Sequence, residues 1–236
     1  MLIASNLTKR FAGFTVIDDA SFSIPKGAIT ACVGPNGAGK STLVNLLSGS
    51  LMPDTGAIAL DDVEITQRPA WFRAGRGLRR TFQNTTGIGE MTVRQNLELG
   101  LWRTSASKGT STVEEIVSLL VLDAVVDAPL NTLPLGVQRK VGIGVAVIGG
   151  STYLLLDEPL AGTEAGDRAM LQDLFKDLAA RGLGIMWIEH DLTSVRRTAE
   201  YLFVVDKGKV IASGAVEAVV ADPRVQDAYW GSAKVG

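Results

Sequence analysis

The segment GPNGAGKST, residues 34–42, constrains the fold of this chain more than any other stretch. It follows a short apolar run, ITACVG at 29–34, and it precedes STLVNLLSG, in which Leu43, Leu46 and Leu47 recur at helical spacing. The pattern G-x-x-x-x-G-K-[ST] between a strand and a helix is typical of a phosphate-binding loop. Glycines let the backbone curl so that N–H groups point at phosphate oxygens, and the following helix adds its positive N-terminal end. The sequence therefore predicts a nucleotide-binding α/β fold.

Two residues at the end of this loop offer an ammonium and a hydroxyl to a nucleotide. Lys40 would reach the β- and γ-phosphates, and the Ser41 hydroxyl would bind Mg²⁺. The residues of the loop expected to contact the nucleotide are Gly34, Asn36, Gly37, Ala38, Gly39, Lys40, Ser41 and Thr42. The other interpretation is a glycine-rich turn with an exposed lysine, which the flanking strand and helix patterns disfavour.

Two further apolar runs end in groups that are able to act on a phosphate. YLLLDEP at 153–159 ends in Asp157 and Glu158, which point to opposite sides of a strand and can do different work. Asp157 would hold Mg²⁺ through its water shell, and Glu158 would act as general base on the attacking water. The alternative is a strand end capped by solvated acids. His190, the single histidine, follows GIMWIE, so it is expected to contact the γ-phosphate, although a surface histidine would give the same pattern.

The remaining pattern gives the fold class. Residues 2–30 and 55–65 alternate as antiparallel strands do, and strand and helix patterns alternate after residue 150. Thr92 is a plausible N-cap before VRQNLEL, and VEEIVSLLVLDAVVD, from residue 113, has helical spacing. We expect an α/β fold: a P-loop NTPase core with a mainly parallel sheet, an N-terminal antiparallel β subdomain and an inserted α-helical subdomain. The predicted division is one domain, residues 1–236, with the core and β subdomain in 1–90 and 151–236 and the helical subdomain in 91–150.

Composition limits the other classes of function. The 236 residues are 46% hydrophobic, enough for a sizeable core, and the net charge of −2 argues against a nucleic-acid binder. No apolar run reaches the roughly 18–20 residues that a membrane-spanning helix needs. The first residues, MLIASNLTKR, lack the apolar core of a signal peptide. These features predict a cytoplasmic protein that reaches a membrane through a partner.

With these motifs in place, the chain resembles the ATPase subunits of ATP-binding cassette (ABC) transporters over nearly its whole length. The motifs are, in chain order, Phe11, GPNGAGKST, Gln83 in RTFQN, the signature loop at 133–137, LLLDE, AGTE, and His190 in IEHDL. The resemblance implies that Phe11 and Val16 contact the adenine and that the Gln83 carbonyl ligates Mg²⁺. It also implies a catalytic set of Lys40, Gln83, Glu158 and His190, and metal ligands Ser41, Gln83 and Asp157.

Two stretches indicate a particular subfamily of these ATPases. RTFQN…GEMTVRQNL and ADPRVQDAYWG resemble the subunits of branched-chain amino acid uptake systems, although amide and urea importers share these features. Such subunits work with ATP and Mg²⁺ as head-to-tail dimers on two membrane permeases fed by a solute-binding protein. The implied location is the inner face of the cell membrane. Two other readings stay open: a cassette of a lipid or polysaccharide exporter, and an ATP-dependent switch with no transport role.

The signature loop, Leu133-Pro134-Leu135-Gly136-Val137, departs from the family pattern L-S-G-G-Q. In the family this loop binds the ATP held by the partner cassette. Pro134 replaces the serine whose hydroxyl would bind the γ-phosphate, and it has no N–H. The N–H groups of Leu135 and Gly136 remain as an anion site at a helix start. We expect a catalytically equipped cassette with a weakened signature, paired in a heterodimer with a cassette whose signature is intact.

A basic run leads into Gln83. Residues 67–82 contain Arg68, Arg73, Arg76, Arg79 and Arg80 and no acid. This run is interpreted either as a solvated basic face or as a contact surface for a permease.

Overall fold

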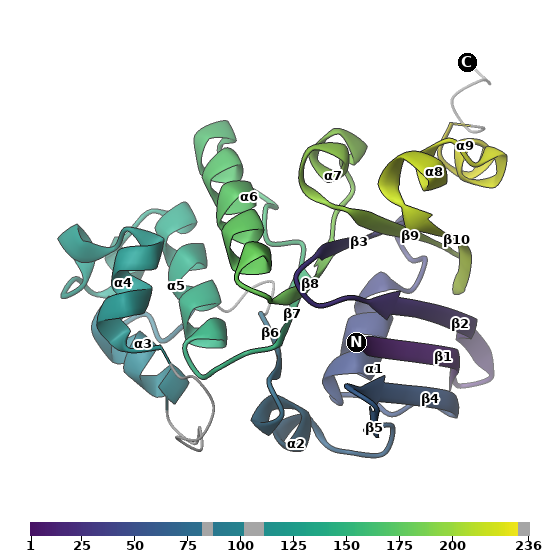
Figure 1. Ribbon diagram of the computed structural model, residues 1–236, viewed down its shortest axis with the longest axis horizontal. Coiled ribbons are helices and arrows are strands. Elements are labelled where there is room, and N and C mark those ends of the chain that lie inside the picture. The colour runs from purple at the N-terminus through teal and green to yellow at the C-terminus, as the bar shows by residue number, and fades with distance from the viewer. Residues whose placement is uncertain (82–86, 102–110, 231–236) are drawn as a thin grey trace.

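The computed structural model describes residues 1–81, 87–101 and 111–230, with side chains as far as Ala228. Gln83 and most of the polar run at 104–112 lie outside these residues. The described residues form two β-sheets with helices packed around them (Figure 1). The mixed α/β architecture confirms the fold class expected from the sequence.

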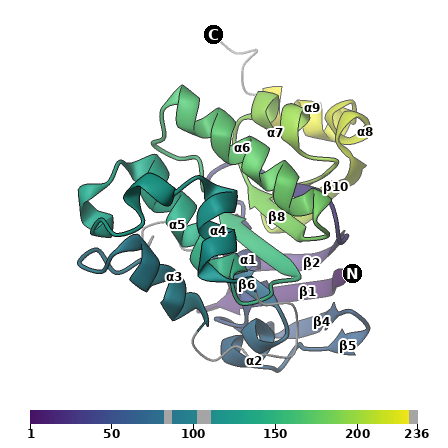
Figure 2. The same ribbon diagram turned by 60° about the vertical axis from the view of Figure 1, so that its left-hand side comes forward.

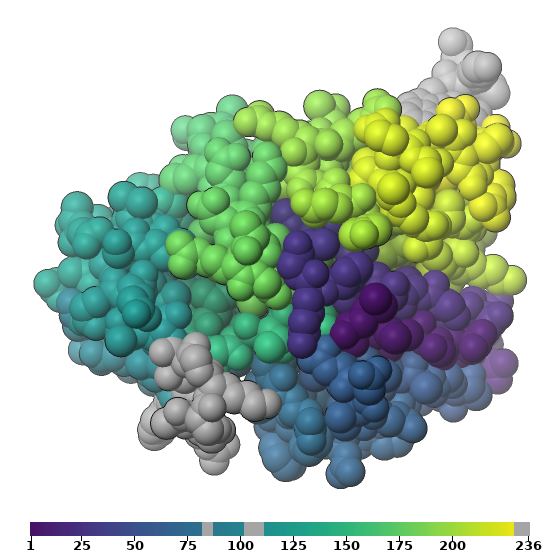
Figure 3. Space-filling model, in the orientation of Figure 1, coloured from purple at the N-terminus to yellow at the C-terminus, as the bar shows by residue number. Residues whose placement is uncertain are grey.

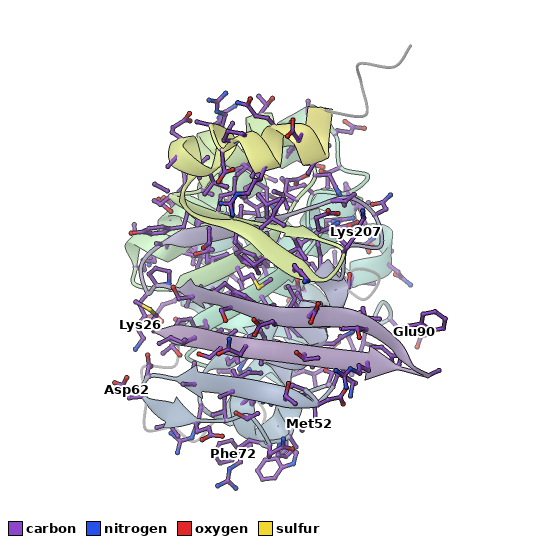
Figure 4. The ribbon with its side chains drawn as sticks, turned by 90° about the vertical axis from the view of Figure 1, so that its right-hand side faces the viewer. Lys26, Met52, Asp62, Phe72, Glu90 and Lys207 are labelled. Carbon is purple, nitrogen blue, oxygen red and sulfur yellow. The ribbon has the colours of Figure 1, made fainter. Side chains whose placement is uncertain are left out.

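Sheet A is antiparallel and comes from the first quarter of the chain. Its strands are β1 (Leu2–Phe11), β2 (Phe14–Ile24), β4 (Thr55–Leu60) and β5 (Val63–Glu64), in the order β2-β1-β4-β5. They lie side by side across the face turned to the viewer in Figure 4, and Figure 1 shows α1 behind them.

Sheet B is mainly parallel and carries the motifs. Its strands are β3 (Ile29–Val33), β6 (Leu78–Arg80), β7 (Tyr153–Asp157), β8 (Gly184–Ile188), β9 (Tyr201–Asp206) and β10 (Lys209–Ala215), in the order β10-β9-β3-β8-β7-β6. Only β10, at one edge, runs antiparallel to its neighbour within this described sheet. The carboxyl ends of β3, β7 and β8 therefore meet at one edge, where the phosphate loop, Asp157 and His190 follow them.

The described helices are α1 (Lys40–Ser48), α2 (Ala70–Gly75), α3 (Val93–Leu101), α4 (Val113–Leu120), α5 (Leu135–Val147), α6 (Ala165–Ala180), α7 (Leu192–Thr198), α8 (Val216–Val220) and α9 (Pro223–Trp230). Two short 3₁₀ helices, Asp123–Val125 and Leu130–Thr132, link α4 to α5. The helices between residues 93 and 147 form a teal lobe on the side of the molecule away from α8 and α9 (Figure 3).

The strands of sheet B are buried on both faces because alternate residues enter different cores. Leu154 and Leu156 of β7 pack with helices α3 to α6, whereas Tyr153 and Leu155 pack with α1 and sheet A. This explains why β7 reads as a continuous apolar run rather than an alternating one. The two cores fix β7 from both sides, so the position of the carboxylates that follow it is well defined.

Helix α4 is shorter than its sequence pattern predicts. It begins at the expected place, where the Thr112 hydroxyl accepts a hydrogen bond from the N–H of Glu115 and the Glu115 carboxylate accepts one from the N–H of Thr112. It stops at Val121, whose φ of 54° is left-handed, and not near residue 127. The chain turns there toward the 3₁₀ helix Asp123–Val125, so the apolar residues beyond Leu120 pack from this turn and the 3₁₀ helix and not from a continued α-helix.

The basic run before Gln83 is neither a uniformly solvated face nor a uniform contact surface. Arg73 is fully buried and donates to the carbonyl oxygens of Leu46 and Leu47 (2.7 and 2.8 Å) at the end of α1. Arg79 and Arg80 are partly buried. These three arginines are internal because each guanidinium satisfies polar groups that would otherwise be buried without partners.

Two arginines of the run remain at the surface. Arg68 and Arg76 both lie over the Phe72 ring, 5.0 and 5.1 Å from its centroid, and the adjacent Trp71 is 73% exposed. Figure 4 places Phe72 at the lower edge of the molecule, near Met52. We call Arg68, Trp71, Phe72 and Arg76 together the α2 surface.

Among the described residues, no helix is both long and apolar enough to cross a membrane.

Candidate nucleotide-binding and catalytic site

The phosphate loop follows β3 and leads directly into α1. Gly39 is the N-cap of α1, with a left-handed φ of 109°, and a Cβ there would lie 2.6 Å from Cδ1 of Ile17. A Cβ on Gly34 would lie 2.1 Å from the carbonyl oxygen of Val205. Glycine is therefore required at both positions, for conformation at one and for space at the other.

The turn between β9 and β10 is hydrogen-bonded to the phosphate loop. The N–H of Gly208 donates to the carbonyl of Ala38 (2.9 Å), and the N–H of Asp18 donates to the carbonyl of Gly208 (2.9 Å). Figure 4 labels Lys207, which precedes Gly208 in this turn. The loop is thus held between β2 and the β9–β10 turn, which limits the freedom that its glycines would otherwise give it.

A pocket opens over the loop. Its lining residues are Val16, Asn36, Gly37, Gly39, Lys40, Ser41, Thr42 and Glu158. Six of these come from the predicted loop, and Glu158 comes from the end of β7. Ala38 is buried beneath the surface, as is Gly34. The structure therefore brings together most of the loop residues expected to contact the nucleotide and the expected general base.

Lys40 lies across its own loop. Its Nζ donates to the carbonyl oxygens of Gly34 (2.7 Å) and Pro35 (3.0 Å), and the residue is 6% exposed. Burial lowers the pKa of Lys40, while the nearby Glu158 and Asp157 act in the opposite direction. The ammonium is thus held at the pocket floor by acceptors that a phosphate oxygen is able to replace.

Asp157 is buried beside the start of α1. Burial raises its pKa, opposed by the Arg80 guanidinium and by a hydrogen bond with Ser41. Nη2 of Arg80 lies 3.9 Å from Oδ2, whereas Oδ1 has no hydrogen-bond partner in the part of the chain that the structure describes. A buried carboxylate oxygen without a partner, next to a serine hydroxyl, is suited to a hard cation or its water shell.

Glu158 and His190 meet across the carboxyl ends of β7 and β8. Nε2 of His190 lies 2.6 Å from Oε1 of Glu158. Glu158 has a left-handed φ of 49°, a conformation that costs energy for a residue with a Cβ. His190 is at the surface, with 42% of its side chain exposed, and it does not itself line the phosphate pocket, but its imidazole faces the carboxylate that does. Its contact with a γ-phosphate stays a prediction.

Arg139, which the sequence analysis did not single out, ties α5 to the loop after β7. Its guanidinium donates to the carbonyl oxygens of Glu158, Pro159 and Ala161. These bonds constrain the backbone at the strained Glu158 and directly after it. The sequence around Arg139 does not indicate this contact, because the partners of Arg139 lie about twenty residues further along the chain.

Arg80 was likewise treated only as part of the basic run. Its Nη1 donates to Oδ1 of Asn45 (2.6 Å) on α1, so one side chain links α1, β6 and the region of Asp157. Because Arg80 is the last residue of a parallel strand, its place in the sequence could have predicted that it lies at the carboxyl edge of the sheet, where ligands bind.

The two residues expected to contact the adenine differ in their relation to the pocket. Phe11 is 43% exposed, with Nζ of Lys9 5.6 Å from its ring centroid, and Val16 lines the phosphate pocket. The Phe11 ring is therefore accessible at the surface, as a base-stacking residue needs to be, but it is not part of the pocket lining.

The signature loop is in a different place. None of Leu133, Pro134, Leu135, Gly136 and Val137 lines the phosphate pocket of this chain. Pro134 is the N-cap of α5 and offers no side-chain hydrogen bond.

The first turn of α5 is close to a carboxylate. A Cβ on Gly136 would lie 2.2 Å from Oδ2 of Asp167, the first-turn acid of α6. Gly136 is therefore needed for packing against α6. The anion site expected at the N–H groups of Leu135 and Gly136 has a negative charge beside it, which weakens it for a second anion.

The fold and these groups define a P-loop ATP-binding cassette, and comparisons with known proteins agree. A sequence profile described as "ABC transporter" matches residues 17–161, and one described as "Branched-chain amino acid ATP-binding cassette transporter" matches residues 209–233. The chain belongs to the ABC transporter ATPase family, whose members bind and hydrolyse ATP.

Individual relatives cover almost the whole chain. A probable branched-chain amino acid transport ATP-binding protein, LivG, of Methanocaldococcus jannaschii is 31% identical over 98% of this chain and 97% of its own length. The lipopolysaccharide export system ATP-binding protein LptB of Acidithiobacillus ferridurans is 32% identical over the same shares. The crystal structure of the ADP conformation of an ABC transporter cassette superposes with a TM-score of 0.87 at 31% identity, covering 98% of each chain.

Proposed function

We propose that this chain is the ATP-hydrolysing subunit of an ABC importer for branched-chain or related amino acids. The observation that carries the enzymatic part is the 2.6 Å contact between His190 and Glu158 at the rim of the phosphate pocket. A carboxylate and an imidazole in contact beside a pocket proposed to hold the phosphates support a catalytic role for both groups. A chain that only bound nucleotide would not need either group there.

The proposed roles follow from position. Lys40 and the loop N–H groups hold the β- and γ-phosphates, and Phe11 and Val16 contact the adenine. Glu158 accepts a proton from the attacking water, and His190 keeps that carboxylate oriented toward the γ-phosphate. Arg139 fixes the backbone that carries Glu158. Gln83, which lies outside the described residues, remains a proposed member of this set.

Mg²⁺ is expected at the buried Oδ1 of Asp157 and the hydroxyl of Ser41, with Gln83 as a further proposed ligand. The unpartnered buried oxygen supports this assignment. When bound, the ion would neutralise charge on the β- and γ-phosphates. Arg80, close to the other oxygen of Asp157, would keep that carboxylate ionised and turned toward α1.

The importer assignment rests on two likenesses. The match of residues 209–233 to the branched-chain amino acid profile covers β10, α8 and α9, which lie outside the catalytic motifs. The LivG relatives are named as probable branched-chain amino acid transport ATP-binding proteins. Export of a lipid or polysaccharide is the second candidate, favoured by LptB relatives of equal identity.

The proposed partners are two permeases, a solute-binding protein acting through them, and a second cassette. The α2 surface supports permease docking, because the exposed Trp71 lies against Phe72, whose ring is contacted by two guanidinium groups. This would hold the chain at the inner face of the membrane. The second cassette is proposed to be a different chain, because the signature loop here lacks side-chain donors.

The Glu158→Gln variant tests the enzymatic part. It should retain ATP binding and lose about 10²–10⁴-fold in phosphate release, because the general base is removed while the shape is kept. The assay is steady-state phosphate release at saturating Mg·ATP, with the partner cassette present. Near-normal turnover in Glu158→Gln would remove Glu158 from the mechanism.

The solute is tested separately, in vesicles that contain the co-purified permeases. ATP-driven uptake of leucine that requires the solute-binding protein, and that Glu158→Gln abolishes, is the expected result. Co-purification with permeases that extract a lipid instead would favour the export function.

A further inference from the structure

A second polar pocket lies between α6 and α7, on the other side of the loop that follows Glu158. Figures 1 and 2 both show these two helices side by side. The pocket is bounded by Thr163 and Arg168 at the start of α6 and by Asp191 and Arg197 on α7. None of its lining residues belongs to the phosphate pocket, so it is a separate site.

Two arginines line this pocket, the half-buried Arg168 and the exposed Arg197. Arg168 and Arg197 have no ion pair to any of the residues that the structure describes. Nε of Arg168 is buried and has no hydrogen-bond partner there. By contrast, the neighbouring Arg196 binds both carboxylate oxygens of Glu217. Two guanidinium groups on one pocket that are not engaged in ion pairs are suited to recognise an oxyanion.

Gln172 makes the pocket a built site rather than a chance approach of surface cations. This residue lines the pocket, is only 3% exposed, and makes no hydrogen bond through its carboxamide within the described residues. Its carboxamide atoms are not among the fully buried atoms without a partner, so they reach the pocket and are available to a ligand. Its NH₂ group is able to donate to the same anion as the guanidinium groups.

The one acid at the rim is already satisfied. Asp191 caps α7, accepting from the N–H of Thr193 (2.9 Å) and from both the N–H and the hydroxyl of Ser194 (3.3 and 2.8 Å). Its carboxylate is therefore committed to the helix and does not neutralise the arginines. The lining keeps a net positive charge.

From this geometry we infer that the pocket between α6 and α7 binds a small free oxyanion, a phosphate or carboxylate group, through Arg168, Arg197 and Gln172. The ligand would bridge Thr163, in the loop after Glu158, and the helix that follows His190. The inference does not depend on the proposed hydrolysis, because none of these residues lies in the phosphate pocket.

The test follows the side-chain NH₂ signals of Gln172 in ¹⁵N spectra, identified by their absence in Gln172→Met. Phosphate and succinate are titrated separately into protein saturated with ADP, so that the phosphate loop is filled. We expect a saturable shift with a dissociation constant of about 0.1–1 mM for at least one of the anions, as for a few charge-assisted hydrogen bonds. The Arg168→Gln/Arg197→Gln variant should weaken it by at least about tenfold.

Arg196→Gln is the matched control, since it removes a neighbouring guanidinium that is paired outside the pocket, and it should leave the affinity unchanged. Backbone spectra of all variants establish that they are folded. Absence of a saturable shift up to about 10 mM of either anion would overturn the inference. So would a shift that appears on raising the protein concentration alone, because the ligand would then be a carboxylate of a second copy. Failure to bind ADP would count against the proposed function only, and the anion titration would still be read at Gln172.

Discussion

The phosphate loop and the signature loop of this chain both begin a helix, but they prepare its N-terminus in opposite ways. Helix α1 starts from Gly39 and offers an ammonium and two hydroxyls in its first turn, whereas α5 starts from Pro134 and offers none. Two helix starts with the same backbone dipole therefore differ in their capacity to bind a phosphate. The difference lies in side chains and neighbouring charge rather than in secondary structure.

The surroundings increase this contrast. The far end of α1 is held by the buried guanidinium of Arg73, while the first turn of α5 packs against the carboxylate of Asp167. One helix is fixed and open to an anion; the other is close-packed beside a negative charge. This is the physical basis for proposing that the chain holds its own ATP well and offers a weak surface to the ATP of a partner.

Removing the anchor of α1 should have the largest effect on stability. Arg73→Met leaves the carbonyl oxygens of Leu46, Leu47 and Thr66 without their buried donor. Each buried unsatisfied carbonyl costs about 1–3 kcal/mol, so the free energy of unfolding should fall by at least about 3 kcal/mol in urea titrations. Arg76→Met, at the exposed side of Phe72, is the control. Equal losses in the two variants would mean that α1 is not anchored by Arg73.

The next largest effect is expected from the lysines of the two helices. Lys40→Ala should weaken ATP binding by about 100-fold, because an ammonium that faces several phosphate oxygens is lost. Lys140→Met in α5, where Nζ binds the carbonyl of Leu120 (3.0 Å), should not change ATP affinity in the isolated chain. Calorimetry measures both. Unchanged affinity in Lys40→Ala would contradict the phosphate-loop assignment.

Restoring the signature should raise activity by a smaller amount. In a homodimer, Pro134 would face both γ-phosphates, so the isolated chain should hydrolyse ATP slowly. Pro134→Ser with Val137→Gln adds one or two charge-assisted hydrogen bonds, each about 1.5–3 kcal/mol before the cost of dimerisation. Phosphate release should therefore increase with protein concentration in the double variant.

A cassette with an intact signature should stimulate the wild-type chain in the same assay. Brisk, concentration-dependent hydrolysis by the wild-type chain alone would show that the Leu135 and Gly136 N–H groups suffice. The proposed asymmetry would then be wrong.

The smallest effect is expected away from both helices, at Asp61. Burial acts to raise its pKa, but hydrogen bonds from Lys26, the Met1 ammonium and Tyr153 outweigh it and lower the pKa to about 2. Because the folded-state pKa is below the unfolded value of about 3.9, this stabilisation is present above pH 4 and lost as pH falls toward 2. Asp61 is 38% exposed, so screening limits the effect to about 1 kcal/mol or less.

Asp61→Asn should remove this pH dependence between 4 and 2 without changing ATP binding at neutral pH. Urea unfolding across that range measures it, with Asp62→Asn, the neighbouring acid in the same turn, as control. An unchanged pH profile in Asp61→Asn would show that the ion pairs at the N-terminus do not contribute.

Local pattern was sufficient where the chemistry is local. The phosphate loop, β7 with its two carboxylates, and the strand before His190 were predictable because glycine spacing and apolar runs report backbone geometry directly. The Thr92 cap was predictable for the same reason: it accepts from the N–H of Gln95 three residues later.

Contacts between distant segments were not predictable in this way. The sequence by itself determined a P-loop α/β cassette with the acid and imidazole at strand ends and a proline in the signature. The tertiary structure alone decided that Arg73 is interior, that Arg139 braces the loop of Glu158, and that the Asp167 carboxylate lies against Gly136. The physical reason is that a side chain's charge and length are written in the sequence, whereas its partners and its burial depend on which segments the fold brings within a few ångströms of it.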